Sequence, residues 1–336
     1  MIEKLKDDRF VKKILLVFLA IQPFLDCWLL YTDEVIGFFG FSPTTIIRTL
    51  IIAVLVLIVF FNKDNKKTRR FIYIYILVIL LYTVIHNFLV FNLDNSGYKV
   101  FNYNLIVEMF YILRMMLPLC IIYITYCLKP KKEEIIQLFL IVGMCISIII
   151  VASNLIVFSL ASYGGGVIKG NVFDWFFSTK YTAGDLASKG WFNSANQISG
   201  LMYIVLPVCI YSLLEQVNKY RIAINILIVI SMIMLGTRVA TYGWLLLFII
   251  MTIIYLFYSF VTKNQRFEKN RIYSILGILV VGLILMSHAP LGNTVTNYTD
   301  EDDDEMKRLR SENVSTKQLL KYIRLSQDHT SCSLYG

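Results

Sequence analysis

Residues 135–159, IIQLFLIVGMCISIIIVASNLIVFS, contain no charged residue and decide the fold class. A run of about 18 or more apolar residues predicts a transmembrane helix, because only a helix satisfies its own backbone groups in hydrocarbon. About nine such runs follow one another, at residues 14–32, 44–61, 71–91, 105–128, 135–159, 195–214, 221–237, 241–261 and 272–288. The sequence therefore predicts an all-α polytopic membrane protein.

The composition leaves no room for a separate soluble domain. Hydrophobic residues make up 57% of the chain and aromatic residues 14%. We expect one transmembrane bundle over residues 1–288, with an outer loop at 160–194, followed by an extracytoplasmic segment at 289–336. Because the chain stops at Gly336 without a closing span, we also expect the last spans of the bundle to be missing.

The distribution of charge sets the predicted orientation. More than half of the 32 Lys and Arg residues lie in the N-terminus and in alternate loops, at 62–70, 129–134, 215–221 and 262–271. Positive charge is enriched in cytoplasmic loops, so the N-terminus is predicted to be cytoplasmic and the C-terminus extracytoplasmic. A basic cytoplasmic face also meets anionic lipid, so the net charge of +9 implies the bilayer and no nucleic acid as a partner.

Six ionisable residues fall within the predicted spans or in the short turn between two of them, and share the outer half of the membrane. Charges in hydrocarbon are costly and normally face a bundle interior or a wet cavity. A common depth therefore predicts a polar chamber that opens outward. The six residues are Asp26, Arg48, His86, Glu108, Arg114 and Arg238.

Arg238 lies in a very short predicted turn between two spans, within residues 235–243, LGTRVATYG. A planar guanidinium held there is suited to bidentate contact with phosphate oxygens. Simpler interpretations remain open. Arg238 can extend to lipid phosphates, Asp26 with Arg48 and Glu108 with Arg114 can be structural ion pairs, and His86 can simply bond a neighbouring helix.

A second polar segment, residues 190–197 (GWFNSANQ), opens the span at 195–214. Ser194 is predicted to cap this helix, and the helix start, with Asn196 and Gln197, favours an anion. The alternative is ordinary capping, and the loop before it can simply be an interfacial loop anchored by aromatic residues.

Other chemistry is not indicated. The six cysteines show no metal or disulfide spacing. Nucleotide-binding and metalloprotease motifs are not found, so neither a metal nor a cofactor is expected.

These segments together resemble the O-antigen ligase/polymerase family of bacterial membrane glycosyltransferases. Residues 191–197, WFNSANQ, are similar to that family's G-x-F-x-N-x-N entry to a span, and Thr237-Arg238 followed by Gly243 is similar to its (S/T)-R-x-x-x-x-G turn. Residues 22–26 (QPFLD) and 108–118 resemble versions from capsule loci of low-GC Gram-positive bacteria.

The resemblance implies an enzyme that joins an undecaprenyl-diphosphate-linked glycan to an acceptor glycan hydroxyl, without nucleotide sugar and without a required metal. It implies a catalytic arginine at Arg238 and a second at Arg308 or Arg310 in a large outer loop. From the chemistry of the reaction, a carboxylate, Glu108 or Asp26, is expected to accept the proton of the acceptor hydroxyl. The residues expected to bind substrate are Arg48, Arg114, Asp26, His86, Asn196 and Gln197. His329 does not match the family's loop histidine.

The function predicted is a capsule, exopolysaccharide or O-antigen polymerase or ligase in the cytoplasmic membrane of a bacterium, working with other polysaccharide assembly proteins. Two alternatives stay open. A flippase for the same lipid-linked unit needs polar residues at the midplane or in both leaflets, and internal repeats. A non-catalytic scaffold or sensor is favoured if the intramembrane charges pair among themselves.

Overall fold

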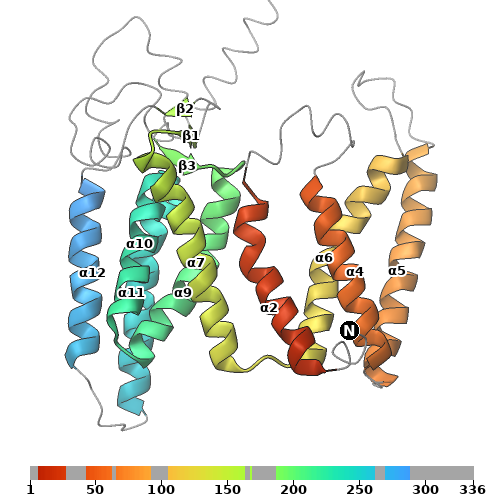
Figure 1. Cartoon of the computed structure of the whole chain (residues 1–336), viewed down its shortest axis with the longest axis horizontal. Helices are drawn as coiled ribbons and strands as arrows, with labels where there is room; N and C mark the ends of the chain where they lie inside the picture. The colour runs from red at the N-terminus through yellow and green to blue at the C-terminus, as the bar shows by residue number, and fades with distance from the viewer. Residues whose placement is uncertain are drawn as a thin grey trace, which may run out of the picture. The chain divides into compact units, whose positions relative to one another are not determined.

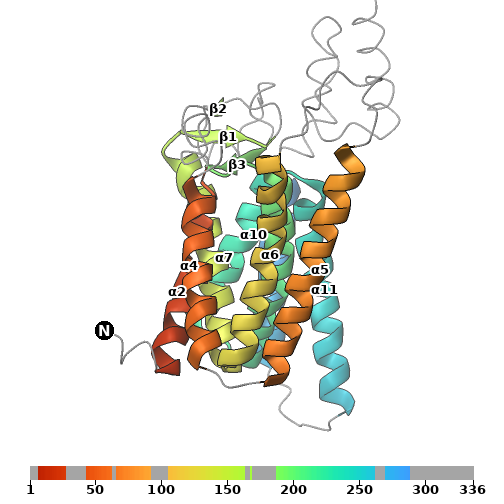
Figure 2. The same ribbon diagram turned by 90° about the vertical axis from the view of Figure 1, so that its right-hand side faces the viewer.

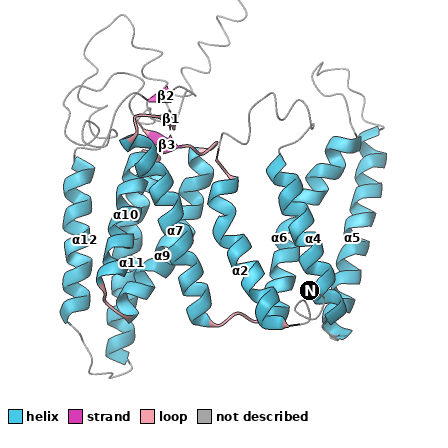
Figure 3. Cartoon of the chain, in the orientation of Figure 1, coloured by secondary structure: helices cyan, strands magenta, loops and turns pink. Residues whose placement is uncertain are grey.

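A computed structural model of the chain describes residues 7–27, 43–62, 66–91, 105–162, 167–168, 187–261 and 269–287. Helices dominate these residues, and three short strands lie together at one end of the helices (Figure 3). Segment 289–336, with Arg308 and Arg310, lies outside the described residues, as do most of residues 163–186.

The helices follow the predicted spans closely. They are α2 (Asp8–Leu25), α4 (Pro43–Asn62), α5 (Lys66–Phe91), α6 (Leu105–Leu128), α7 (Lys132–Leu155), α9 (Ala195–Glu215), α10 (Lys219–Leu235), α11 (Arg238–Val261) and α12 (Lys269–Ser287). Within the residues searched, five helices are long and apolar enough to cross a membrane: α4, α7, α9, α11 and α12. The predicted polytopic helical fold is confirmed. The predicted orientation and total number of spans stay predictions.

The first predicted span is wrong at both ends. The helix begins at Asp8 and ends at Leu25, where 14–32 was predicted. Asp26 lies in the turn that follows, and Cys27 then pairs with Phe192 in an antiparallel bridge. Asp26 is therefore placed at the helix end, not inside a membrane helix as predicted. Apolar residues continue past Leu25 in the sequence, but there the chain leaves the helix and pairs with a distant backbone segment.

The outer loop predicted at 160–194 contains a small sheet. Strands β1 (Ser159–Ala161), β2 (Val167–Ile168) and β3 (Ser188–Gly190) pair antiparallel in the order β2-β1-β3. In the second of these pairings Leu160 lies opposite Gly190, and Ala161 opposite Ser188. A loop without regular structure was expected. The strands are too short for an alternating pattern to distinguish them from loop.

The chain divides into two compact units. The first comprises residues 1–18 and 36–131, and the second comprises 19–35 and 132–336. In the first unit α6 packs against α4 and α5. In the second unit α9 and α10 pack against each other and against α7 and α11, and the sheet covers one end of α7 and α10 (Figures 1 and 2). We call this end of the second unit the sheet end.

The core of the second unit is built where small residues let helices approach closely. A Cβ at Gly143 of α7 would lie 2.8 Å from Ile228 Cδ1 and 2.9 Å from Val205 Cγ1. Gly243 of α11 lies against the ring of Tyr203, and Gly282 of α12 against the indole of Trp244. Such contacts stabilise helix pairs in membranes, where hydrophobic burial between helices contributes little.

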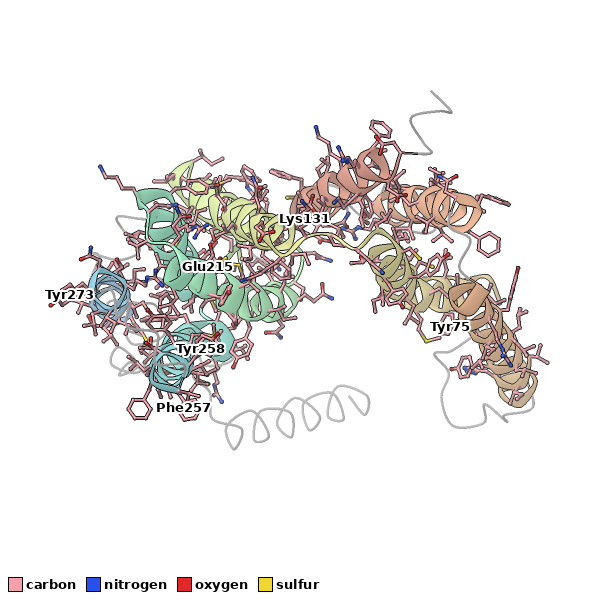
Figure 4. All side chains as sticks on the ribbon, turned by 90° about the horizontal axis from the view of Figure 1, so that it is seen from below. Tyr75, Lys131, Glu215, Phe257, Tyr258 and Tyr273 are labelled. Carbon is pink, nitrogen blue, oxygen red and sulfur yellow. The ribbon has the colours of Figure 1, made fainter. Side chains whose placement is uncertain are left out.

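The opposite end of the second unit is basic and aromatic. Lys132 contacts the Tyr211 hydroxyl and forms an ion pair with Glu215, with Nζ and Oε1 3.0 Å apart. Figure 4, seen from below, labels Glu215 at this end, together with Tyr258 of α11 and Tyr273 of α12, whose side chains are exposed. Aromatic and basic residues of this kind are typical of a membrane–water interface.

Candidate functional site: the sheet end of the second unit

The turn between α10 and α11 is as short as predicted. Helix α10 ends at Leu235, Gly236 caps it in the left-handed conformation with φ of 65°, and α11 begins at Arg238. The Gly236 N–H donates to Ile233 O at 3.1 Å. A left-handed cap is accessible to glycine without the Cβ penalty, so Gly236 permits the abrupt reversal.

Hydroxyl groups from two other segments hold this turn in place. Ser199 of α9 lies 2.6 Å from the Thr237 hydroxyl, and Ser162 donates to Leu235 O at 2.7 Å. Thr237 Oγ1 also accepts from the Ala240 N–H at 3.1 Å, so it caps α11. Ser199 donates to Ala195 O at 2.7 Å, which leaves Thr237 as donor in the shared bond. Each of the two hydroxyls then donates once and accepts once.

Arg238 is the first residue of α11, and its side chain is exposed. A cation at the start of a helix faces the positive end of the helix dipole, so this position does not stabilise the helix. The same location suits the binding of an anion, because the backbone N–H groups of a helix start and a guanidinium lie together.

The entrance to α9 lies beside this turn. Ser194 is the N-cap residue, as predicted, with an extended backbone. Its hydroxyl makes no capping hydrogen bond. The predicted position of the cap is therefore correct, but the predicted side-chain hydrogen bond is not formed. Asn196 and Gln197 follow in the first turn of α9 and are both exposed. Because Ser199 is bonded to Thr237, these amides and Arg238 belong to the starts of two helices that lie together.

Asp26 is brought to the same segment by backbone pairing. Its neighbour Cys27 forms the bridge with Phe192, two residues before Ser194. Asp26 is half-buried. Thus four of the predicted site residues lie on segments that meet at the sheet end: Asp26, Asn196, Gln197 and Arg238.

A buried polar cluster fixes the sheet on the end of α7. The Asn154 amide donates to Ile150 O at 2.8 Å and to Ser188 Oγ at 2.9 Å, and its oxygen accepts from Ser159 at 3.1 Å. Asn154, Ser159 and Ser188 are all fully buried. Side-chain hydrogen bonds between buried groups are costly to break, since each lost partner leaves a polar atom without water.

Lys189 is a residue that sequence analysis did not select. It lies on β3, is half-buried, and donates from Nζ to Asn193 O at 2.9 Å. Burial lowers the pKa of its ammonium below the ordinary lysine value. In the sequence, only its place directly before residues 190–197 separates Lys189 from the other lysines of the outer loop.

Comparison with protein families matches residues 8–318 to the family described as O-antigen ligase like membrane protein. The chain belongs to the O-antigen ligase-like family. This confirms the resemblance drawn from residues 191–197 and 236–243. Membership indicates a multi-pass membrane enzyme that processes glycan, and it suggests ligation or polymerisation of lipid-linked glycan at the membrane. No curated protein and no solved structure matches the chain.

The remaining predicted site residues of this O-antigen ligase-like chain belong to the first unit or lie outside the described residues. Arg48 is half-buried on α4, and the His86 ring on α5 packs edge-on against Tyr82, with centroids 5.4 Å apart. Glu108 and Arg114 lie on α6, but the structure does not describe their side chains. Whether these residues join Arg238 in one chamber stays a prediction.

Among the described residues no group of three or more His, Cys, Asp or Glu side chains could hold a metal ion. The residues at the sheet end provide the chemistry of a cationic anion site together with a carboxylate. Arg238 and Lys189 supply charge, Asn196 and Gln197 supply neutral donors, and Asp26 supplies a group that can accept a proton.

Proposed function

We propose that this member of the O-antigen ligase-like family joins undecaprenyl-diphosphate-linked oligosaccharide repeat units at the outer face of a bacterial cytoplasmic membrane. Within this reaction class we favour a capsule or exopolysaccharide polymerase over a ligase. One observation carries the proposal: Arg238 starts α11 beside the entrance of α9, in a turn that Ser199 and Ser162 hold through hydrogen bonds. An arginine fixed in this way at a helix start suits the diphosphate of a lipid-linked glycan.

The proposed reaction is a direct displacement. An acceptor hydroxyl attacks the anomeric carbon of the donor sugar, a new C–O bond forms, and the bond from that carbon to the diphosphate oxygen breaks. The electron pair leaves with undecaprenyl diphosphate. The hydroxyl proton passes to a carboxylate, either Asp26 or Glu108. The diphosphate linkage already contains the required free energy, so no nucleotide sugar takes part.

Arg238 would act on the leaving group. Negative charge grows on the bridging oxygen as the bond breaks, and a guanidinium already in place stabilises that charge without reorganisation. A loop arginine, Arg308 or Arg310, would contact the same diphosphate, with Arg48 and Arg114 also binding substrate. The acceptor glycan, the bilayer and other polysaccharide assembly proteins are the proposed partners.

Deleting the gene in its host provides the test in cells. We expect polymer to disappear and single lipid-linked repeat units to accumulate in the outer leaflet, where an enzyme added to intact cells can reach them. Expression of the wild-type chain should restore polymer. Accumulation in the inner leaflet would indicate a flippase instead, and unchanged polymer would contradict both functions. Full restoration by a chain with Arg238→Ala would exclude Arg238 from the reaction.

A further inference from the structure

We propose that Lys189 is a further substrate-binding residue, whose ammonium contacts the diphosphate of the lipid-linked glycan while it keeps its hydrogen bond to Asn193 O. This inference rests on the proposed function and adds a residue to the same site. It starts from the position of Lys189 on β3, next to the segment that leads into α9.

The backbone around Lys189 is held firmly on both sides. Ser188, before it, accepts from the Asn154 amide at 2.9 Å and from the Gly190 N–H at 3.1 Å. Gly190, after it, has φ of 63° and packs so closely on α7 that a Cβ would lie 2.9 Å from Ile150 Cα. A lysine side chain is flexible, but here its Cα is fixed, and the bond to Asn193 O directs the ammonium toward the start of α9.

The ammonium retains capacity for a ligand. It has three N–H donors, and Asn193 O uses one of them at 2.9 Å. Among the described residues Lys189 forms no ion pair with a carboxylate. The elements packed against β3 are α7, β1, α9 and α10. Their acidic residues Glu133, Glu134 and Glu215 lie at the end of the bundle away from the sheet.

The surroundings of Lys189 disfavour its charge in the free protein. Partial burial lowers its pKa, and the adjacent start of α9 is the positive end of a helix dipole. The Cys27–Phe192 bridge brings the segment of Asp26 to the residues that follow Lys189, and no ion pair joins these two side chains in the described structure. A bound anion between Lys189 and the start of α9 would favour the charged form of the lysine. It would therefore offset the effects of both the burial and the helix dipole.

Binding of farnesyl diphosphate, a short soluble polyprenyl diphosphate, tests the inference on the full chain in detergent. Lys189→Met should weaken binding by about 10- to 100-fold, the usual range for loss of a charge-assisted hydrogen bond. Lys189→Arg should keep most of the affinity. Lys219→Met is the matched control, because Lys219 is exposed at the opposite end of α10 and loses the same charge. It should bind like wild type.

The outcomes separate the two proposals. If wild type binds and Arg238→Ala weakens binding while Lys189→Met does not, the role of Lys189 is refuted and the proposed function stands. If wild type does not bind farnesyl diphosphate at all, both are refuted. If Lys189→Met binds weakly and Lys189→Arg binds equally weakly, the lysine acts through local structure, and the contact with diphosphate is refuted.

The pH dependence of binding gives a second readout that also serves if Lys189→Met does not fold. The pKa of Lys189 is lowered, so its ammonium is charged below that value and neutral above it. Affinity should therefore fall as the pH rises through the lowered pKa. Lys189→Arg does not titrate in this range, so its affinity should persist to higher pH. Identical pH profiles for wild type and Lys189→Arg would overturn the inference.

Discussion

Replacing Arg238 with alanine is expected to lower the rate of glycan transfer by about 100- to 1,000-fold, with the amount of folded protein unchanged. This is the usual cost of removing one preorganised group that stabilises charge in a transition state. The side chain is exposed, and the turn that holds it is bonded through the Thr237 hydroxyl and the Leu235 carbonyl. The fold should therefore tolerate the change. Polymer length and the turnover of lipid-linked units are the quantities to measure.

Arg238→Lys should recover only part of this loss, because an ammonium keeps the charge but lacks the planar fork that binds two phosphate oxygens at once. Val239→Ala is a suitable control, since Val239 is the next residue of α11 and is also exposed. It should leave the rate unchanged. Normal polymer length with Arg238→Ala, at equal protein level, would exclude Arg238 from the reaction.

Gly190→Ala is expected to destabilise the second unit and to abolish activity through loss of the sheet. A left-handed φ costs a residue with a Cβ about 1–2 kcal/mol. The new Cβ would also lie 2.9 Å from Ile150 Cα and 3.3 Å from Ile149 O, which are backbone atoms of α7 and cannot turn aside. Either β3 must leave α7 or the buried Asn154–Ser188 bond must break. Thermal unfolding in detergent measures the loss.

Gly200→Ala provides the matched control. Gly200 lies in α9 on an exposed face, and a Cβ there would meet nothing within 4 Å. Alanine is favoured over glycine in a helix interior by about 1 kcal/mol. This variant should be as stable as wild type or more stable. Equal melting temperatures for Gly190→Ala and wild type would contradict the tight packing of β3 on α7.

The helices were predictable because the membrane imposes a simple rule. Each span must be long, apolar and helical, so ends such as Leu128 and Val261 follow from the sequence alone. The turn at Arg238 was predictable for the same reason, because two spans leave only a few residues between them. The local sequence therefore predicts both the helix ends and this turn.

What could not be predicted depends on contacts between distant residues. Helix α2 ends at Leu25, two residues before Cys27 pairs with Phe192, and hydropathy carries no trace of that partner. The strands are only two or three residues long, and Asn154 of α7 bonds to Ser188 of β3 and Ser159 of β1, which are far from each other in the sequence. Lys189 resembles the other loop lysines until β3 fixes its backbone. The Ser194 hydroxyl was expected to cap α9 and does not.

The most direct measurement is turnover by the purified full chain in detergent, supplied with one undecaprenyl-diphosphate-linked repeat unit and no nucleotide sugar. We predict glycans of two or more repeat units on the lipid, and one undecaprenyl diphosphate released for each new linkage, with both products lost in Arg238→Ala. Return of the intact single unit, together with transport of that unit across reconstituted vesicles, would contradict the enzyme and identify a transporter.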